Sequence, residues 1–421
     1  MRIAVVGGGY VGLVTGACFA ELGHIVDIVE IDAGKAAAIN AGRAPIHERG
    51  LDALLAKHAG VRLRAGTDYG PVALSDLAFI CVGTPPAADG SADLSMVAAA
   101  SRSIGEALRE GKSAHTVVVK STVPPGTTEN LVAPTVGNHS HRADTGFAMN
   151  PEFLREGRAV EDFLHPDRIV IGSRDGRSGD TVAAAYTGVS APVVRCGLTA
   201  AEMIKYASNA LLATKISFAN EVGNVCKRLG IDVYEVMQGV GMDHRVSPHF
   251  LDAGAGFGGS CFPKDVAALV SLAEGLGEEP ALLRSVLDVN DRQPLRMVRM
   301  LEERIGDLAG KRVAVLGLAF KDNTDDIREA RAVPVIAGLL QRGAAVAAYD
   351  PLAAASMRRV FPGIDYAASA ADALRGADAC LVMTEWPEFS TLNGEFDLMN
   401  SRIVIEGRRI LSCDGKEGIC W

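Results

Sequence analysis

The sequence predicts an α/β protein in which two doubly wound domains are joined by a long central helix and a helical middle region. Short β-branched runs alternate with helix-like segments over residues 1–198, and the same alternation returns after residue 309. Between them, residues 199–308 read as mostly helical. Apolar strands that alternate with helices are typical of βαβ units around a buried parallel sheet. We therefore expect an N-terminal domain at 1–198, a helical region at 199–308 and a C-terminal domain at 309–421.

The N-terminal domain is expected to contain strands at short apolar, β-branched runs. These runs are Ile3–Val6, Ile25–Val29, Leu77–Val82, Thr116–Lys120, Arg168–Ile171 and Pro192–Val194. From Thr199 to Leu229 no proline occurs, and apolar residues recur at helical spacing. This spacing predicts one helix of about thirty residues, roughly 45 Å long. Because one domain does not need so long a helix, we expect it to link the domains and to offer a face for self-association.

After this helix the pattern stays helical until the C-terminal domain begins. A glycine-rich loop at Ala253–Gly259 interrupts the helices. The C-terminal strands are expected at Arg312–Leu316, Ala344–Ala348, Ala379–Met383 and Ile403–Ile405. The tail from Ser412 to Trp421 has no clear pattern, and we expect it to be peripheral.

The composition excludes several classes of function. The 421 residues are 48% hydrophobic and 22% charged, which suits folded cores. The formal charge of −9 includes no basic block, so nucleic acid is not expected as a partner. No run of 18 uncharged apolar residues predicts a membrane span. The eight cysteines form no CxxC pair, which argues against zinc and against a disulfide scaffold and favours the reducing cytoplasm. No metal is expected.

The glycine-rich segment after the first strand predicts a dinucleotide site of the Rossmann-like kind. Gly7, Gly9 and Gly12 form a GxGxxG pattern that allows a tight turn, an approach to a pyrophosphate and close helix packing. Glu30 ends the second strand, where its carboxylate can accept the ribose hydroxyls and repel the 2′-phosphate of NADP. NAD is therefore the expected cofactor, and Lys35 is a further candidate contact for its ribose or phosphates.

Two later strand ends point to the same crevice. The segments Val82–Pro85 and Lys120–Gly126 each end a strand with hydroxyl, glycine and proline residues. Ligands of open α/β sheets bind beyond the carboxyl ends of the strands, where these segments fall. Thr84 and Thr122 are their candidate site residues.

The segment Gly254–Asp265 surrounds a cysteine with glycines and charged residues. Its glycines bring the backbone close to another group, and Cys261 stands where a helix is expected to begin. Asp265 follows one turn later on the same face. A thiol at a helix N-terminus beside Lys264 is expected to have a lowered pKa, which favours a nucleophile over a buried filler.

Polar residues also recur on the long helix. Lys205 and Asn209 are four residues apart and share one face, to which Asn220 returns at nearly the same angle. Polar side chains on a largely apolar face are costly unless they meet partners or a ligand. Glu152 and Glu156 follow a strand end, and their spacing also fits the acidic first turn of a helix.

Together these segments closely resemble the UDP-glucose/GDP-mannose 6-dehydrogenase family. The resemblance extends from Met1 to about Leu411 and rests on several long motifs in the family's order. They are GGGYVG at Gly7–Gly12, VGTP at Val82–Pro85, STVPPGT at Ser121–Thr127, NPEFLREG at Asn150–Gly157, HPDRIVIG at His165–Gly172, GFGGSCFPKD at Gly256–Asp265 and FKDNTDDIRE at Phe320–Glu329.

The resemblance implies two NAD-dependent hydride transfers from C6 of a sugar nucleotide, without release of the aldehyde. Cys261 matches the family nucleophile that forms a thiohemiacetal and then a thioester. Lys205 and Asn209 match the lysine and asparagine that act on the C6 oxygen. The polar groups that position and deprotonate water correspond to Asp265, Glu152 and Thr122, and the principal base among them stays open.

The resemblance also implies the binding residues and a homodimer. For NAD it implies Gly7, Gly9, Tyr10, Val11, Gly12, Glu30, Lys35, Thr84, Thr122 and Glu156. For the substrate it implies Glu152, Phe153, Leu154, Lys205, Asn209, Arg245, Phe250, Leu251, Gly254, Phe257, Gly258, Phe320, Lys321 and Arg408. Arg245 is expected to reach across the dimer interface. The C-terminal domain, whose Gly317 stands without a GxGxxG, is expected to hold the uridine diphosphate.

Alternatives remain within and outside the family. Phe262 and the run Asp243–Leu251 favour UDP-glucose as the small-molecule substrate, with GDP-mannose or a UDP-N-acetylhexosamine as alternatives by the same mechanism. A single-step hydroxyacid dehydrogenase would leave Cys261 idle. An inactive nucleotide-sugar-binding protein would not need lysine, asparagine, cysteine and aspartate together. The chain departs from the family at Glu30, commonly aspartate, and at Glu406 and Glu329–Arg331 near the C-terminal site.

Overall fold

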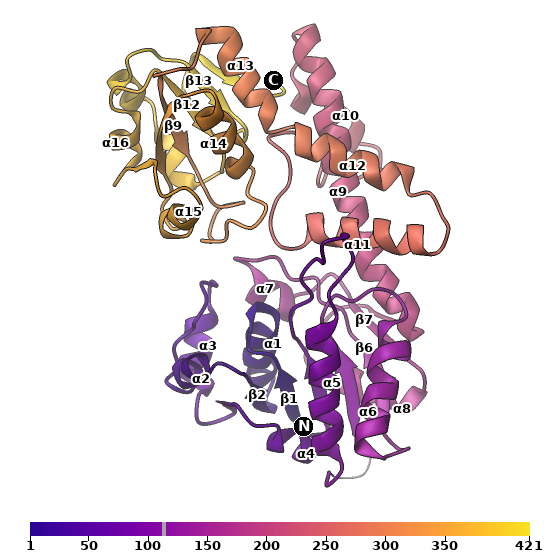
Figure 1. The fold of residues 1–421 in the computed structure, drawn as a ribbon. Helices are drawn as coiled ribbons and strands as arrows, with labels where there is room; N and C mark the ends of the chain where they lie inside the picture. The colour runs from indigo at the N-terminus through magenta and orange to yellow at the C-terminus, as the bar shows by residue number, and fades with distance from the viewer. Residues whose placement is uncertain (112–114) are drawn as a thin grey trace. The chain divides into compact units, whose positions relative to one another are not determined.

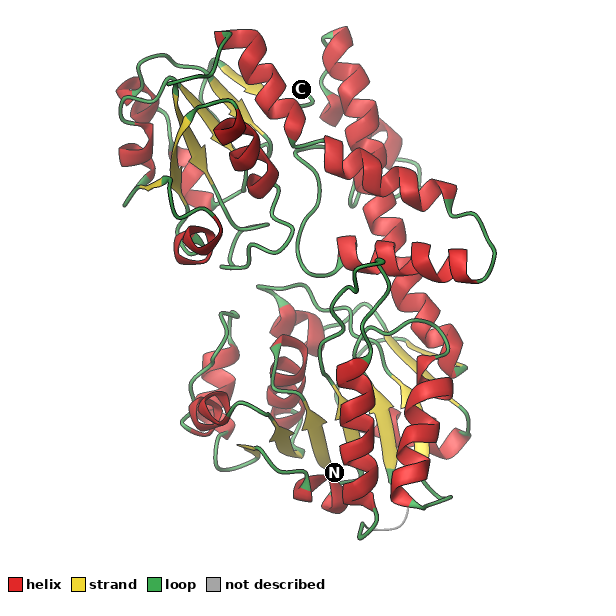
Figure 2. Cartoon of the chain, in the orientation of Figure 1, coloured by secondary structure: helices red, strands yellow, loops and turns green. Residues whose placement is uncertain are grey.

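The structure is a computed structural model that describes residues 1–111 and 115–421. It divides into two compact units, Met1–Ser208 and Asn209–Trp421. Each unit contains a sheet flanked by helices (Figures 1 and 2), so the predicted α/β class with two doubly wound sheets is confirmed.

Within the described part of the first unit, the sheet has eight strands in the order β3-β2-β1-β4-β5-β6-β7-β8. The strands are β1 (Arg2–Val6), β2 (Ile25–Val29), β3 (Leu63–Gly66), β4 (Leu77–Ile80), β5 (Thr116–Val119), β6 (Gly146–Met149), β7 (Ile169–Ser173) and β8 (Val193–Cys196). All neighbours pair in parallel except β6 and β7, which are antiparallel. The six predicted strands are present, whereas the short strands β3 and β6 were not expected.

Apolar residues on both faces of this sheet form two cores. Successive β1 side chains alternate between them: Ile3 packs into one core with α1 residues, and Ala4 into the other with α5 residues. The helices of the unit are α1 (Tyr10–Glu21), α2 (Ala33–Asn40), α3 (Leu51–His58), α4 (Gly70–Leu74), α5 (Ser95–Leu108), the π-helical turn η1 (Thr128–Val132), α6 (Ala133–Ser140), α7 (Ala159–Leu164) and α8 (Gly176–Ala185). With both faces covered, the edge beyond the strand ends is left for ligands.

The predicted long helix is present as α9 (Leu198–Leu229), which begins in the first unit and ends in the second. The helical middle follows it with α10 (Val233–Gly241), α11 (Phe262–Gly275), α12 (Ala281–Arg292) and α13 (Leu295–Ile305). The glycine-rich loop at 253–259 separates α10 from α11, as the sequence predicted.

The sheet of the second unit has six strands within the described residues, all parallel, in the order β11-β10-β9-β12-β13-β14. They are β9 (Arg312–Leu316), β10 (Ala345–Tyr349), β11 (Asp365–Tyr366), β12 (Ala379–Val382), β13 (Val404–Glu406) and β14 (Lys416–Gly418). Its helices are α14 (Ala332–Gln341), α15 (Ala354–Val360), α16 (Ala370–Leu374) and the 3-10 turns η2 (Pro387–Thr391) and η3 (Gly394–Leu398).

The expectation of a peripheral C-terminal tail is wrong. β14 adds to the sheet beside β13, and Ile419 and Cys420 are fully buried in the core of the unit. The Trp421 ring packs edge-on against Tyr234 at 5.2 Å between centroids. The tail has too few apolar residues to show a period, and only the free edge of β13 gives this short segment a place to pair.

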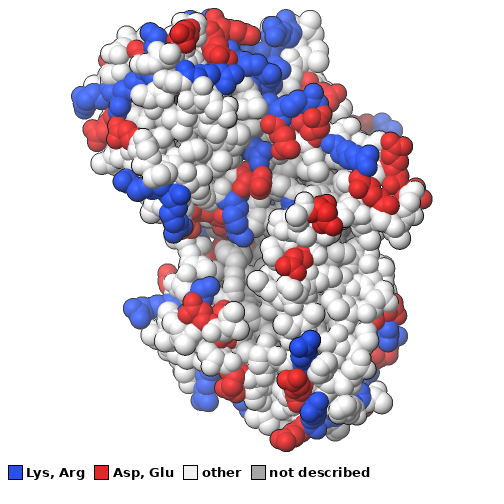
Figure 3. Space-filling model, viewed as in Figure 1, with Lys and Arg blue, Asp and Glu red and all other residues white. Residues whose placement is uncertain are grey.

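The surface carries both signs of charge. Figure 3 shows lysine and arginine side chains interspersed with acidic ones on the face in view. None of the helices in the described residues combines the length and hydropathy needed to cross a membrane. The same residues contain no group of three or more His, Cys, Asp and Glu side chains placed to hold a metal ion.

Candidate active site

The glycine-rich turn between β1 and α1 has the shape of a pyrophosphate cradle. Gly7 has a φ of 103°, and a Cβ there would lie 2.8 Å from the Cys81 carbonyl oxygen. A Cβ on Gly12 would collide with the Gly7 carbonyl oxygen. Gly9 faces open space and precedes α1 without a side-chain cap, so the first amides of the helix remain available to an anion. These residues therefore fit the diphosphate of a dinucleotide.

Glu30 lies directly after β2, beside this turn. Its carboxylate is buried and accepts hydrogen bonds from the amides of Gly8 at 3.0 Å and Asp32 at 2.9 Å. Each carboxylate oxygen keeps a second lone pair, so contact with a ribose diol remains possible. Lys35 is exposed in the first turn of α2. Ile31 is 89% exposed, an unusual position for a large apolar side chain, and it suits the face of a base.

Tyr10 links the glycine turn to the NPEFLREG segment, together with Glu48, a residue that the sequence analysis did not select. Its hydroxyl donates to the Glu48 carboxylate and accepts from the Gly157 amide at 2.9 Å. Glu48 also accepts from the amides of Gly157 at 2.7 Å and Ala159 at 2.9 Å. Burial, followed by the Glu48 carboxylate, raises the pKa of Tyr10. No motif marked Glu48, because a lone loop glutamate has no sequence signature.

The remaining predicted NAD contacts lie near this turn or at strand ends. Val11 packs against the core on the α1 face, and Glu156 is half-buried next to Gly157. Thr84 Oγ1 donates to the Thr122 carbonyl oxygen at 2.9 Å, so the loops after β4 and β5 are joined.

Glu152 and Lys205 form a buried ion pair in the first unit. Lys205 Nζ lies 3.0 Å from Glu152 Oε1, and the side chains are only 4% and 6% exposed. The Leu154 amide donates to Glu152 Oε2 at 2.6 Å. Burial raises the pKa of Glu152, but the charge of Lys205 and the Leu154 amide outweigh it and leave that pKa below its usual value. The carboxylate is therefore ionised beside an ammonium group.

Phe153 lies beside this pair under two cations. The Arg168 guanidinium is 3.9 Å from the ring centroid, and Lys205 Nζ is 5.3 Å from it. The structure thus brings together four groups of the first unit, of which the sequence analysis had selected all but Arg168.

Asp265 is the centre of the polar cluster in the second unit. Its carboxylate is buried and accepts from Asn209 Nδ2 at 2.6 Å and from Lys264 Nζ at 2.5 Å. Cys261 is the residue that precedes α11, and its carbonyl oxygen accepts from the Asp265 amide at 2.9 Å. The half-buried Cys261 thiol lies 3.7 Å from the Ser260 hydroxyl. Asp265 therefore connects Asn209 of α9 to the first turn of α11, which begins directly after Cys261.

The glycines before Cys261 approach protein groups of the same unit. Asn290, on α12, accepts from the Phe257 amide at 2.7 Å and donates to its carbonyl oxygen at 3.1 Å. A Cβ on Gly258 would collide with the Glu329 carbonyl oxygen, and one on Gly259 would lie 2.7 Å from the Phe320 ring. The glycine run is therefore required by close packing of the loop, and Asn290 is a further residue that the sequence analysis missed.

Asn220 also forms a hydrogen bond with this loop. Its side-chain oxygen accepts from the Gly254 amide at 2.7 Å, and it is fully buried. Helical spacing aligned Asn220 with Lys205 and Asn209, but the neighbouring backbone explains why an asparagine is needed there.

The other predicted substrate residues of the second unit are spread over several elements. Phe250 packs edge-on against Phe262 at 6.2 Å between centroids, and Leu251 is buried. Arg408 donates to the Gly256 carbonyl oxygen at 2.5 Å and lies 3.1 Å from Glu385. Lys321 Nζ is 5.5 Å from the Phe320 ring centroid.

Arg245 is not part of these clusters. Its side chain is 78% exposed and pairs with Asp243 at 2.6 Å, two residues earlier in the chain.

In the second unit, the acidic residue at the position of Glu30 has its carboxylate occupied by protein donors. Asp350 follows β10, the position that Glu30 has after β2. Its buried carboxylate accepts from the Trp386 indole at 3.0 Å. It also accepts from the amides of Leu318, Ala319, Leu352 and Ala353. These protein donors occupy the carboxylate, so this sheet differs from the first one as a cofactor site.

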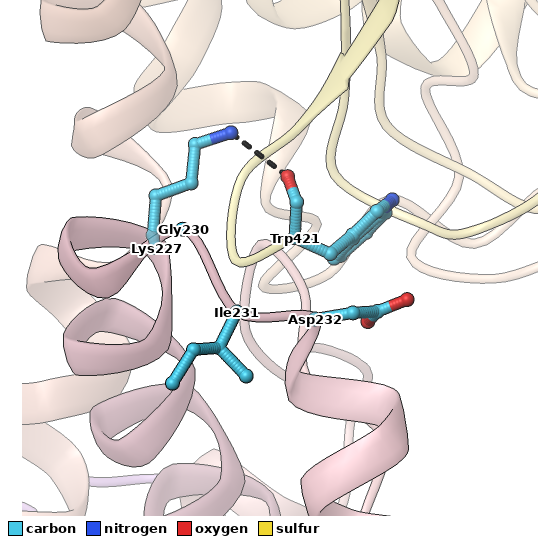
Figure 4. A pocket seen from close by; sticks show the side chains of 5 residues that line it. All are labelled: Lys227, Gly230, Ile231, Asp232 and Trp421. Atoms are coloured by element: carbon cyan, nitrogen blue, oxygen red, sulfur yellow. Dashed lines mark hydrogen bonds between the residues drawn. The ribbon is translucent and has the colours of Figure 1, made fainter.

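A cavity of about 310 Å³ in the second unit contains none of the predicted site residues (Figure 4). It is lined by Lys227, Gly230, Ile231, Asp232 and Trp421. The Lys227 ammonium points away from the turn and donates to the Trp421 carbonyl oxygen at 2.8 Å. This contact ties the end of α9 to the C-terminal segment.

Three family models match the chain. They are the NAD binding domain of the UDP-glucose/GDP-mannose dehydrogenase family at residues 1–190, its central domain at 199–292 and its UDP binding domain at 314–413. The first of these matches confirms NAD as the cofactor.

Relatives match over nearly the whole length. The UDP-glucose 6-dehydrogenase AglM of Haloferax volcanii is 52% identical over 98% of this chain and 97% of its own. The UDP-glucose 6-dehydrogenase YwqF of Bacillus subtilis is 41% identical over 98% and 94%. The structure of a UDP-glucose dehydrogenase from Pyrobaculum islandicum aligns with a TM-score of 0.95 and 45% identity, covering 100% and 98% of the two chains. By these matches and by its own motifs, the chain belongs to the UDP-glucose/GDP-mannose dehydrogenase family.

Proposed function

We propose that this chain oxidises the C6 alcohol of UDP-glucose to the carboxylate in two NAD-dependent steps, through a thiohemiacetal and a thioester on Cys261. One observation carries the proposal: α9 presents Lys205, paired with Glu152, and four residues later Asn209, paired with Asp265. These groups match the lysine, asparagine and aspartate that the family uses with its cysteine. The relatives named as UDP-glucose 6-dehydrogenases support UDP-glucose as the substrate.

The first step removes a proton from the C6 hydroxyl while a hydride leaves the carbon. Bound NAD supplies the hydride acceptor. Lys205 stabilises the negative charge that develops on the oxygen or takes its proton. The Glu152 carboxylate, 3.0 Å from Lys205 Nζ, balances the positive charge of the Lys205 ammonium. Asn209 uses one N–H on Asp265, which leaves its second N–H to donate to the same oxygen.

The second hydride must leave a tetrahedral carbon that bears a hydrogen, and addition of the Cys261 thiol to the aldehyde produces such a carbon. The thiol sulfur bonds to the aldehyde carbon and the thiol proton moves to the carbonyl oxygen, which forms the thiohemiacetal. This carbon then loses a second hydride, for which a second NAD would supply the acceptor, and its hydroxyl group loses a proton, which leaves a thioester. Water attacks the thioester and the carbon–sulfur bond breaks, so that the carboxylate is released. One proton of the water passes to the sulfur, which restores the Cys261 thiol, and the other passes to the solvent. Asp265, Glu152 and Thr122 are the candidate groups that position and deprotonate this water.

The uridine diphosphate is assigned to the second unit. Lys321 and Arg408 provide cations there, and the occupied carboxylate of Asp350 leaves no second dinucleotide ribose site of the Glu30 kind. The contacts proposed for the sugar nucleotide are those that the resemblance to the family implies. Boundaries at residues 198 and 308 are proposed to separate the regions for cofactor binding, catalysis and substrate binding.

All eight cysteines are free thiols in the described chain, which supports a cytoplasmic location.

The proposal is tested by NADH release from three sugar nucleotides supplied separately: UDP-glucose, GDP-mannose and UDP-N-acetylglucosamine. We expect UDP-glucose to react fastest and to give about two NADH per sugar, because the alcohol loses two hydrides before release. A yield of about one NADH would contradict the thioester route. Faster reaction of GDP-mannose or of the N-acetyl sugar would move the assignment to that substrate.

An apolar stripe on α9 supports the proposed homodimer. Leu211, Phe218 and Val225 recur every seven residues and are 63%, 52% and 57% exposed. Seven residues are close to two helical turns, so these side chains lie on one side of α9. A repeated exposed apolar stripe is typical of a helix that packs against another helix. A second copy of the chain offers the same stripe, so the two stripes can pair about a two-fold axis.

We expect Phe218→Asp to yield monomers, because a charge at the centre of the stripe cannot be desolvated without a partner. Sedimentation or light scattering measures the change. Leu282→Asp on α12 is the matched control, since Leu282 is 66% exposed and lies outside the stripe. The control is expected to keep the dimer. A Phe218→Asp protein that retains the wild-type mass would contradict this interface.

A further inference from the structure

Lys120 is a buried lysine to which the mechanism above gives no role. It follows β5 and is only 3% exposed. Its Nζ donates to Asn150 Oδ1 at 3.0 Å, to the Tyr186 hydroxyl at 3.1 Å and to the Asn150 carbonyl oxygen at 3.5 Å. The ring centroids of Phe163 and Tyr186 lie 5.8 and 5.9 Å from it.

None of these contacts is with a carboxylate. Among residues 1–111 and 115–421, no acidic oxygen lies within 4.0 Å of Lys120. A buried ammonium held only by neutral groups is costly, and an apolar side chain would fill the same space beside the two aromatic rings. Packing alone therefore does not account for a lysine at this position.

Asn150 connects Lys120 to the segment of the chain that carries Glu152. The Asn150 side-chain oxygen accepts from Lys120 and from Tyr186, and its Nδ2 donates to the Val170 carbonyl oxygen at 2.8 Å. Its backbone amide donates to the Val119 carbonyl oxygen at 2.8 Å. The side chain of Asn150 and both of its backbone polar groups therefore have hydrogen-bond partners. Pro151 and Glu152 follow directly, which means that the fixed asparagine sets where the Glu152 carboxylate begins.

The charge of Lys120 also reaches Glu152. Burial raises the pKa of Glu152, while Lys205, the Leu154 amide and, more weakly, Lys120 lower it. Among the described residues, the titratable groups that interact with this carboxylate include Lys205 from α9, Lys120 from the end of β5 and the Cys81 thiol from the end of β4. Burial raises the pKa of Cys81 to about 12, so that thiol stays neutral.

We propose that Lys120 is a positioning residue for the oxidation: its buried ammonium holds Asn150 and, through it, keeps the Glu152 carboxylate placed and ionised beside Lys205. The inference rests on the proposed function, in which Glu152 and Lys205 act at the C6 oxygen.

The direction of the pKa change expected without Lys120 follows from the positive charge that is removed. Removing one positive charge favours the protonated form of each neighbouring group, so Glu152 and Lys205 both keep their protons to higher pH. If the reaction uses ionised Glu152, the acidic limb of the kcat profile moves to higher pH in a variant without the Lys120 charge. The loss of kcat relative to the wild type is then greater near about pH 6 than near about pH 9.

Lys120→Met and Tyr186→Phe separate this role from a structural one. Both remove hydrogen bonds from the same cluster, including the one between Lys120 and Tyr186, but only Lys120→Met removes the charge. We expect the acidic limb to move to higher pH in Lys120→Met and to stay in place in Tyr186→Phe. The carbon-13 titration of the Glu152 carboxylate, assigned with Glu152→Gln, reports the same shift without substrate or cofactor. The proposal would be overturned if the acidic limb of the kcat profile lay at the same pH in both variants. It would also be overturned if the Glu152 carboxylate titrated at the same pH in Lys120→Met as in the wild type.

Asn150→Asp covers the case in which Lys120→Met does not fold. It keeps the size of the side chain and places a carboxylate against the ammonium, so the same upward shift is expected. An unchanged limb in this variant counts against the proposal. A wild-type protein that does not release two NADH from UDP-glucose would refute the proposed function instead, whatever the Lys120 variants show.

Discussion

Cys261→Ser is expected to bind NAD and UDP-glucose like the wild type but to lose sustained turnover, on the order of 10³-fold or more in kcat. Cys261 precedes α11, in a different segment of the chain from Lys321 and Arg408, the cations proposed to contact the diphosphate. Serine is a weaker nucleophile, and it cannot form the thioester that the second oxidation produces. Binding is measured by calorimetry and turnover by continuous NADH release.

Cys196→Ser provides the control for this loss. Cys196 is partly exposed like Cys261, but it belongs to β8 and no motif includes it. We expect this variant to keep wild-type kcat. Full steady-state activity of Cys261→Ser would refute the covalent mechanism, whereas weakened binding in that variant would show that the thiol has a role in holding the substrate.

Lys205→Met is expected to lower both activity and stability. Loss of the group at the C6 oxygen should reduce kcat by about 10²- to 10⁴-fold. The change also leaves the buried Glu152 carboxylate without its ion-pair partner, which costs about 3–5 kcal/mol of unfolding free energy. Urea unfolding measures this loss, and initial rates at saturating NAD measure kcat.

The double variant Lys205→Met/Glu152→Gln separates the two effects. It replaces the orphaned carboxylate by a neutral amide, so most of the stability is expected to return while the activity does not. Retention of wild-type kcat in Lys205→Met would refute its proposed role.

The wild type is expected to show the matching pH dependence of stability. The pKa of Glu152 in the folded protein lies below its usual value, so its ionised form stabilises the fold above that usual value. This contribution is lost as the pH falls through the lowered pKa. The Lys205→Met variant should lose stability at neutral pH already, because its carboxylate is buried and unpaired there.

The strands and the long helix could be predicted because their signals are local. A run such as Ile25–Val29 carries its own β-branched pattern, and the proline-free stretch of α9 is longer than any competing pattern. The family resemblance rested on contiguous motifs, which are equally local. Short strands such as β6, which begins with glycine, and β14 become strands only because a neighbouring strand offers them a free edge.

The supporting residues of the candidate site could not be predicted in the same way. Glu48 meets Tyr10 and Gly157, and Asn290 meets Phe257, in each case across many residues of sequence. A buried polar side chain is recognised by its partners, and a single sequence does not list those partners. For Asn220 the sequence left open whether the side chain meets a protein partner or a ligand, and the structure gives its side-chain oxygen a partner in the Gly254 amide.

The fold class, the dinucleotide turn, the polar residues of α9 and the cysteine motif can be recognised in the sequence, because each depends on spacing within one segment. The pairing of Glu152 with Lys205, the hydrogen bonds of Asp265 with Asn209 and Lys264, and the place of the tail in the sheet become visible only in the folded chain. Charge, burial and hydrogen bonding are set by which segments meet, and only the folded chain brings those segments together.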